Sequence, residues 1–194
     1  MEYLVTMTTH VPEGTTEAEV ADVRAREAAH SAELAAQGHL IRLWRPPLEP
    51  GEWRSLGLFA ADGGDALEQV LASMPLRVWR TDEVTPLGAH QNDPGLPASK
   101  GVAEFLTTFT VAPADGTSAE VVNDARAREA VRARELAVAG NLRRLWALPG
   151  EGRNLGLWQA FDGDEMREIV KTLPLDPYMT TEITPLTAHP SDPG

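Results

Sequence analysis

Two glutamates occupy equivalent places in two long amphipathic segments, and both fall among residues that should be buried. Glu27 lies on a stripe with three-and-four spacing, and Glu129 lies on the matching stripe further along the chain. A buried carboxylate is costly unless it is paired, and without a partner its pKa rises. A glutamate with a raised pKa suits general base catalysis near neutral pH. The alternative is a structural ion pair, which Glu27 could form with Arg24 or with an arginine on a strand.

Arginines beside two tryptophans form a second group of candidates. They are Arg42 and Arg45 on either side of Trp44, and Arg143 and Arg144 shortly before Trp146. Neighbouring side chains on a strand point to opposite faces, so Arg143 and Arg144 cannot both face one site. One arginine could bind an anionic substrate through its bidentate fork, whereas solvated charge on an edge strand is the alternative. The tryptophans are expected in the core or in a pocket wall.

Polar residues at the start of the second hairpin strand are a third group. Asn154 and its counterpart Ser55 could donate a hydrogen bond to a developing oxyanion if they are buried. Ordinary turn chemistry would account for them equally well.

Metal and nucleotide motifs are not found in the sequence. Among the histidines only His90 and His189 recur at equivalent places, and the chain has no cysteine and no pair of ligands at helical spacing. It also has no phosphate-binding glycine loop and no nucleophile elbow. We therefore expect neither a metal nor a cofactor.

An internal repeat organises the whole chain. Residues 21–44, ADVRAREAAHSAELAAQGHLIRLW, reappear at 123–146 as NDARAREAVRARELAVAGNLRRLW. Two copies are too few for a solenoid, but each is long enough to be a small domain. The repeat predicts one module over residues 1–95, a linker at 96–101 and a second module over 102–194, as in a covalently joined pseudo-dimer.

Each copy shows the same order of expected elements. β-branched and aromatic residues predict first strands at 2–10 and 103–111, and a long helix follows each of them. These helices should start after Thr15 or Thr16 and after Thr117 or Ser118, and should end before Gly38 and Gly140. Two short strands, a second helix (65–73 and 164–172) and a last strand complete the unit. The pattern is β-α-β-β-α-β, which predicts tandem ferredoxin-like α+β modules.

Composition narrows the class of protein. A net charge of -12 argues against nucleic-acid binding, because a phosphate backbone would be repelled. No apolar run is long enough to span a bilayer, so no membrane partner is expected. The first residues lack a basic leader and a cleavage site, and together with the absence of cysteine they favour a cytoplasmic location.

Several of these residues together resemble the muconolactone delta-isomerase family over nearly the full length of each copy. The features are a mid-helix glutamate, a following glycine, a strand with the pattern R-x-L-W and an Asn-containing strand. In the second copy a late segment, LPLDPYM followed by His189-Pro190, adds to the likeness. The first copy departs from this pattern at Ser55, at MPLRVWR (residues 74–80) and at Gln91.

The resemblance implies a fold, an activity and site residues. The fold would be an intramolecular dimeric α+β barrel, and the activity would be cofactor-free movement of a double bond in an unsaturated lactone during breakdown of aromatic compounds. Glu129 and Glu27 would transfer the proton, an arginine would hold the substrate carboxylate, and Asn154 would steady the dienolate oxygen. The wall of the pocket would include Trp53, whose counterpart is Gly152. The remaining residues that the resemblance places at the substrate are Arg42, Arg143, Arg144, Ser55, Trp44, Trp146 and Tyr178.

Three readings remain open from the sequence. The partner is a small anionic or lactone substrate if the chain is an isomerase, and the fused chain could assemble further as a homo-oligomer. A cofactor-free monooxygenase, or a cyclase or isomerase acting on an aromatic polyketide, could use the same fold. A non-catalytic small-molecule binding protein would have ion-paired glutamates. Within the isomerase reading, the more family-like second copy is expected to dominate activity.

Overall fold

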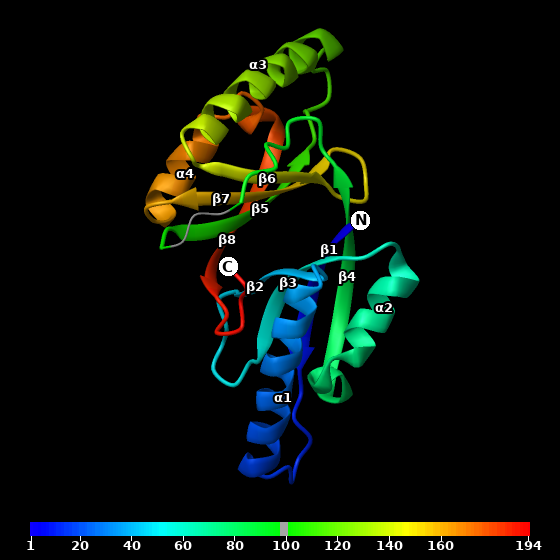
Figure 1. The fold of residues 1–194 in the computed structure, drawn as a ribbon. Helices are drawn as coiled ribbons and strands as arrows, with labels where there is room; N and C mark the ends of the chain where they lie inside the picture. The colour runs from blue at the N-terminus through cyan, green and yellow to red at the C-terminus, as the bar shows by residue number, and fades with distance from the viewer. Residues whose placement is uncertain (98–100) are drawn as a thin grey trace. The chain divides into compact units, whose positions relative to one another are not determined.

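The chain is an α+β protein whose strands all pair in the antiparallel sense. The computed structural model describes residues 1–97 and 101–194, and in these ranges it has eight strands and four α-helices (Figure 1). The predicted α+β class is therefore confirmed. Residues 98–100 of the predicted linker lie outside the described residues.

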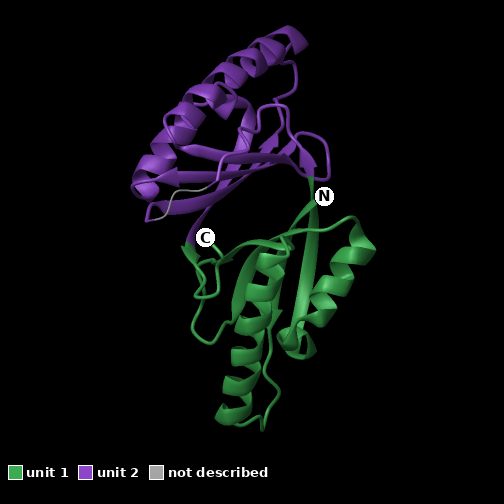
Figure 2. Ribbon diagram, in the orientation of Figure 1, with its two compact units in different colours: residues 1–87, 187–194 green, residues 88–186 purple. Residues whose placement is uncertain are grey.

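Two compact units make up the chain, and they do not coincide with the sequence repeats. Unit 1 consists of residues 1–87 and 187–194, and unit 2 consists of residues 88–186 (Figure 2). Residues 88–95 belong to the first repeat but to unit 2, and residues 187–194 belong to the second repeat but to unit 1. The end of each repeat thus belongs to the unit formed mainly by the other repeat.

Unit 1 places two helices on one face of its strands. Its elements are β1 (Glu2–Thr9), α1 (Glu17–Ala36), β2 (Leu40–Arg45), β3 (Arg54–Ala60), α2 (Gly64–Ser73), the short 3-10 helix η1 (Pro75–Trp79) and β4 (Arg80–Ala89). The strand order is β4-β1-β3-β2, and the end of β8 pairs with β2. Alternate residues of β1, such as Val5 and Met7, are buried on one face because side chains alternate along a strand. They pack with Leu34 of α1 and Leu71 of α2.

Unit 2 repeats this arrangement. Its elements are β5 (Ala103–Val111), α3 (Ala119–Val138), β6 (Leu142–Ala147), β7 (Arg153–Ala160), α4 (Gly163–Lys171), the 3-10 helix η2 (Asp176–Tyr178) and β8 (Met179–Ala188). The strand order is β8-β5-β7-β6, and the end of β4 pairs with β6. Phe105 and Phe109 of β5 pack with Leu136 of α3 and Met166 of α4. None of the helices in the described part of the chain combines the length and apolar character needed to cross a membrane.

Local sequence signals explain where the long helices start and stop. Thr16 caps α1 in a capping box with Glu19, and Ser118 caps α3. Gly38 and Gly140 follow the two helices with φ of 77° and 87°, which is the left-handed conformation that glycine adopts without strain. These ends fix the helical register, which places Glu27 on the face of α1 that points into unit 1.

Candidate active site

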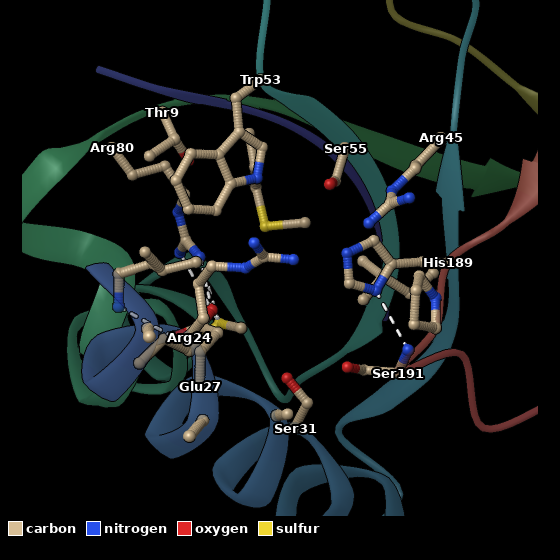
Figure 3. A pocket seen from close by; sticks show the side chains of 18 residues that line it. Thr9, Arg24, Glu27, Ser31, Arg45, Trp53, Ser55, Arg80, His189 and Ser191 are labelled. Atoms are coloured by element: carbon tan, nitrogen blue, oxygen red, sulfur yellow. Dashed lines mark hydrogen bonds and ion pairs between the residues drawn. The ribbon is translucent and has the colours of Figure 1, made fainter. Parts of the chain in front are cut away.

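Unit 1 contains a cavity of about 370 Å³ with charged and apolar walls (Figure 3). The walls come from α1, β1, β2, β3, the start of β4 and the terminal segment that follows β8. Its polar side chains are Thr9, Arg24, Glu27, Ser31, Arg45, Ser55, Arg80, His189 and Ser191. Met7, Leu43, Trp53, Met74 and Leu76 supply most of the apolar surface. A cavity of this size can hold a small organic acid.

Glu27 is the half-buried carboxylate of this cavity. One of its oxygens, Oε2, accepts a hydrogen bond from the backbone N–H of Leu76 at 2.8 Å, and Oε1 lies 3.2 Å from Nη1 of Arg80. Burial raises the pKa of Glu27, and the Leu76 N–H and the Arg80 charge oppose that rise without cancelling it. Glu27 thus has both features weighed from the sequence, because it is paired with a strand arginine and still has a raised pKa.

Arg80 is held by a second acid behind the cavity wall. The side chains of Arg80 and Asp82 are each only 2% exposed, and two hydrogen bonds of 2.6 and 3.0 Å join them. Asp82 also accepts a hydrogen bond from Arg77 at 2.5 Å. Because Asp82 takes the bidentate face of Arg80, the guanidinium is fixed in place and reaches Glu27 with one remaining N–H.

Arg24 and Arg45 are the cations available to a ligand. Both line the cavity, and within the described part of the chain neither forms a salt bridge with a carboxylate. The guanidinium of Arg24 lies over the ring of Trp53, 5.6 Å from its centroid, which orients the head group. Figure 3 shows Arg24 and Arg45 with their head groups in the cavity opening above Glu27 and His189. The lining therefore favours an anion.

His189 enters the cavity on the terminal segment. The end of β8 pairs with β2, with Ala188 opposite Trp44 and Thr187 opposite Arg45, and the terminal segment (residues 189–194) follows it directly. Burial, together with the charges of Arg45 and Arg24, lowers the pKa of His189 to about 4. The imidazole is therefore neutral near neutral pH.

The equivalent cavity of unit 2 is smaller and mostly apolar. Its volume is about 50 Å³, and its polar side chains are Glu129, Asn154, His90 and Asn92. Glu129 accepts a hydrogen bond from the Leu175 N–H at 3.0 Å, and burial raises its pKa. No basic side chain among the described residues forms a salt bridge with it.

Three replacements between the repeats account for this difference. Arg45, Trp53 and Arg80 of the first copy correspond to Ala147, Gly152 and Met179 of the second. Gly152 has φ of 68°, and a Cβ there would lie 2.7 Å from the carbonyl oxygen of Val111. An aromatic side chain therefore does not fit at Gly152, and among the described residues the unit 2 cavity has neither a counterpart of Trp53 nor an arginine in its lining.

The two cavities contain six of the candidate residues from the sequence. Glu27, Arg45, Trp53 and Ser55 line the first cavity, and Glu129 and Asn154 line the second. The other candidates line neither of them, which differs from the expectation. They are Arg42, Arg143, Arg144, Trp44, Trp146 and Tyr178.

Two of these arginines form ion pairs with aspartates that lie after β8 and after β4. Asp192 pairs with Arg42 at 2.9 Å, and Asp93 pairs with Arg144 at 3.3 Å. Each guanidinium also lies over the adjacent tryptophan, at 4.9 Å from the Trp44 centroid and 4.7 Å from the Trp146 centroid. Arg42 thus fastens the terminal segment to β2, and Arg144 fastens the segment after β4 to β6, and neither arginine lines a cavity.

Sequence reasoning missed parts of the site that a pattern could have indicated. Arg24 precedes Glu27 by three residues, so it lies on the adjoining helix face, but it was considered only as an ion-pair partner. His189 has an equivalent in the first copy, His90, and this recurrence could have marked it as a candidate site residue. Arg80 begins a strand far from Glu27 in the chain, and no local pattern connects the two.

Comparisons with known proteins match the two repeats of this chain separately. The family model of muconolactone delta-isomerase matches residues 1–93 and again residues 103–192. The chain belongs to the muconolactone delta-isomerase family. Within this family, the Rhodococcus opacus enzyme is 34% identical over 91 residues, which is 98% of that protein and 47% of this chain. The Acinetobacter lwoffii muconolactone delta-isomerase 1 is 35% identical over 77 residues, which is 80% of that protein and 40% of this chain.

Solved structures show the fold of this family member over nearly the whole chain. A heme-binding protein from Thermus thermophilus matches with a TM-score of 0.62 at 11% identity, covering 98% of this chain and 93% of that one. A chlorite dismutase from Candidatus Nitrospira defluvii matches with a TM-score of 0.61 at 9% identity, covering 96% of this chain and 91% of that one. At such low identity the likeness concerns the fold alone.

The described residues of this chain contain no cluster of side chains that could bind a metal ion. No three side chains of His, Asp or Glu lie close enough there to hold an ion. The chemistry that the residues in the first cavity can carry is proton transfer by Glu27 next to an anion held by Arg24 and Arg45.

Proposed function

We propose that this chain is an isomerase that moves a double bond in an unsaturated lactone carrying a carboxylate, such as muconolactone. The reaction takes place in the cavity of unit 1. The observation that supports it best is one cavity in which a half-buried carboxylate with a raised pKa shares the lining with two arginines that form no salt bridge within residues 1–97 and 101–194. This assignment differs from the expectation that the second copy would dominate.

Glu27 carries the proton in this proposal. It removes a proton from the saturated γ-carbon of the lactone ring, and the electron pair spreads to the carbonyl oxygen as a dienolate. Returning the same proton to the α-carbon moves the double bond and restores the carboxylate of Glu27, so atoms and charge balance. A raised pKa helps both steps, because a base with a pKa nearer to neutrality also returns the proton readily.

Arg24 and Arg45 hold the carboxylate of the substrate. A guanidinium binds a carboxylate with two parallel hydrogen bonds, so a pair of arginines fixes the acid and leaves the ring to face Glu27. The fixed orientation is itself a source of rate, since it keeps the reacting carbon next to the base. Ser55 and Trp53 line the side of the ring in this arrangement.

Incubating the wild-type protein with muconolactone in buffer containing EDTA tests the proposal. We expect an ultraviolet change as the ring double bond moves, at a rate that does not depend on added metal. Wild-type protein that binds muconolactone but leaves its spectrum unchanged over hours would contradict the isomerase function.

Replacing one cavity arginine should weaken substrate binding. Arg45→Gln removes a charge-assisted pair of hydrogen bonds, which is worth about 1.5–3 kcal/mol, so KM should rise about 10- to 100-fold while kcat changes less. Steady-state kinetics on muconolactone measure this. Arg26→Gln is the matched control, because Arg26 lies on α1 in an exposed pair with Asp22. Equal effects of the two substitutions would contradict the role of Arg45.

A small-molecule binding protein is the second candidate, and the Glu27–Arg80 pair favours it. A carboxylate held by an arginine and by a backbone N–H could serve as a fixed wall of an anion site without moving a proton. In that case muconolactone would bind in an Arg45-dependent manner and would be recovered unchanged.

A further inference from the structure

We propose that His189 is a catalytic hydrogen-bond donor of the unit 1 site, whose Nε2–H binds the lactone carbonyl oxygen and stabilises the dienolate. The carbonyl-binding part concerns any ligand of this cavity that has a carboxylate and a nearby carbonyl group. The catalytic part rests on the proposed function. The residue comes from the end of the second repeat, while Glu27 comes from the first.

The tautomer of His189 follows from its backbone neighbour. The N–H of Ser191 donates to Nδ1 of His189 at 3.1 Å, so Nδ1 is the acceptor and the single ring proton of the neutral imidazole is on Nε2. Figure 3 shows the ring nitrogen that does not face Ser191 directed toward the centre of the cavity, where Arg24 and Arg45 also point. The ring therefore presents a donor, and not an acceptor, to a ligand.

The surrounding charges keep this donor neutral. Burial lowers the pKa of His189 to about 4, with Arg45 on β2 and Arg24 on α1 lowering it further and Asp192 on its own segment opposing them. Asp192 is itself paired with Arg42. A neutral imidazole is a known way to polarise a carbonyl group without giving up a full proton.

The terminal segment holds the imidazole in place before any ligand binds. The N–H of His189 donates to the carbonyl of Leu43 at 3.0 Å, and Asp192 accepts from the Leu43 N–H at 2.8 Å. A donor that is already oriented needs no reorganisation when charge develops on the ligand oxygen, which makes such donors effective in catalysis. The Arg42–Asp192 pair, which lies outside the cavity, thus positions the segment that carries His189.

Unit 2 has the same imidazole arrangement and serves as an internal comparison. The N–H of Asn92 donates to Nδ1 of His90 at 3.1 Å, and burial lowers the pKa of His90. The position of Arg45 is taken there by Ala147, so the neighbouring carboxylate site is incomplete. His90 is therefore a matched residue for substitution experiments.

Kinetics of three variants test the catalytic part. His189→Ala should lower kcat for muconolactone about 10²- to 10³-fold, the usual effect of losing one oxyanion donor, with a smaller effect on KM. His189→Gln, whose amide keeps an N–H near the same place, should recover part of the loss. His90→Ala should change kcat by less than about twofold if the donor in unit 1 is the relevant one. Full activity in His189→Ala, or equal losses in the two alanine variants, would overturn the proposal.

Binding of two inert acids separates the failure of this inference from the failure of the proposed function. The probes are the saturated analogue of muconolactone, which has the carboxylate and the lactone carbonyl, and cyclopentylacetate, which has the carboxylate only. Wild-type protein should prefer the lactone acid by about tenfold, the worth of one good hydrogen bond, and His189→Ala should abolish that preference. Arg45→Gln should weaken both probes together. If wild-type protein shows this preference but does not turn over muconolactone, the proposed reaction fails and the His189 assignment stands.

Nitrogen-15 NMR of the imidazoles measures the tautomer and the protonation of His189 independently of activity. We expect the Nε2–H tautomer for His189 and no titration between pH 5 and pH 8. An Nδ1–H tautomer, or a titration near the ordinary value, would overturn the proposal irrespective of activity.

Discussion

Glu27→Gln should lower kcat for muconolactone by about 10²- to 10⁴-fold, the range expected for loss of a positioned general base. Glutamine keeps the size of the side chain and can still accept the Leu76 N–H, so binding of the substrate should change little. The loss should appear in kcat and in kcat/KM alike, because the missing proton acceptor acts only in the transition state. Stopped-flow or steady-state ultraviolet measurements give both constants.

Glu129→Gln is the matched substitution in unit 2, and its effect should be less than about threefold on the scale of such general-base losses. Burial also raises the pKa of Glu129, but among the described residues its cavity of about 50 Å³ has no arginine in its lining and no counterpart of Trp53. Equal losses in the two variants would show that both units work and would contradict a single site in unit 1. A loss confined to Glu129→Gln would return the activity to the second copy.

The same assignment fixes the direction of the pH dependence. Burial raises the pKa of Glu27 above its ordinary value of 4.5, so the basic form is lost as the pH falls through a value higher than that. We expect kcat/KM to decline on the acid side with an apparent pKa above 4.5. His189, with a pKa of about 4, should add no titration near neutrality.

Asp82→Ala should destabilise the chain by about 3 kcal/mol, the low end of the cost of removing one partner from a buried ion pair. Arg80 would keep Glu27 but lose the two short hydrogen bonds that hold its guanidinium, inside a site where both side chains are 2% exposed. Arg77 would lose its acceptor as well. Urea unfolding followed by circular dichroism measures the change.

Thr181→Ala is the control, because Thr181 is the residue of the second repeat at the position of Asp82. It carries no charge, so its removal should cost less than about 1 kcal/mol. If Asp82→Ala lowered the free energy of unfolding no more than Thr181→Ala, the Arg80–Asp82 pair would make no measurable contribution to stability. In that case Arg80 would not be fixed by Asp82, and its pairing with Glu27 would need another cause.

Local signals in the sequence were sufficient to predict the helices and strands. The helix starts at Thr16 and Ser118 and the glycine ends at Gly38 and Gly140 are local signals, because capping and left-handed backbone involve residues only a few positions apart. The inward orientation of Glu27 and Glu129 could also be predicted, since a helix repeats every 3.6 residues and the apolar stripe fixes which face turns inward. The repeat showed that both halves would share these features.

Long-range contacts determine which residues meet at the site. Arg80 reaches Glu27 across 53 positions of sequence, and Asp192 reaches Arg42 across 150. Periodicity carries no information about such pairs, because they depend on which strand edges and chain ends pair in the folded state. For the same reason the sequence assigned Arg42 and Arg144 to the substrate, although Asp192 and Asp93 form ion pairs with them.

The exchange of chain ends is the feature that the sequence could not reveal. The repeat places His189 in the second module, whereas strand pairing beyond Thr187 places it beside Glu27 in unit 1. A strand can continue onto any free edge with unpaired backbone groups, so the choice of edge is made by long-range hydrogen bonding and by the Arg42–Asp192 pair. The sequence thus determined the kinds of groups available for catalysis, and the folded chain decided which of them share a cavity.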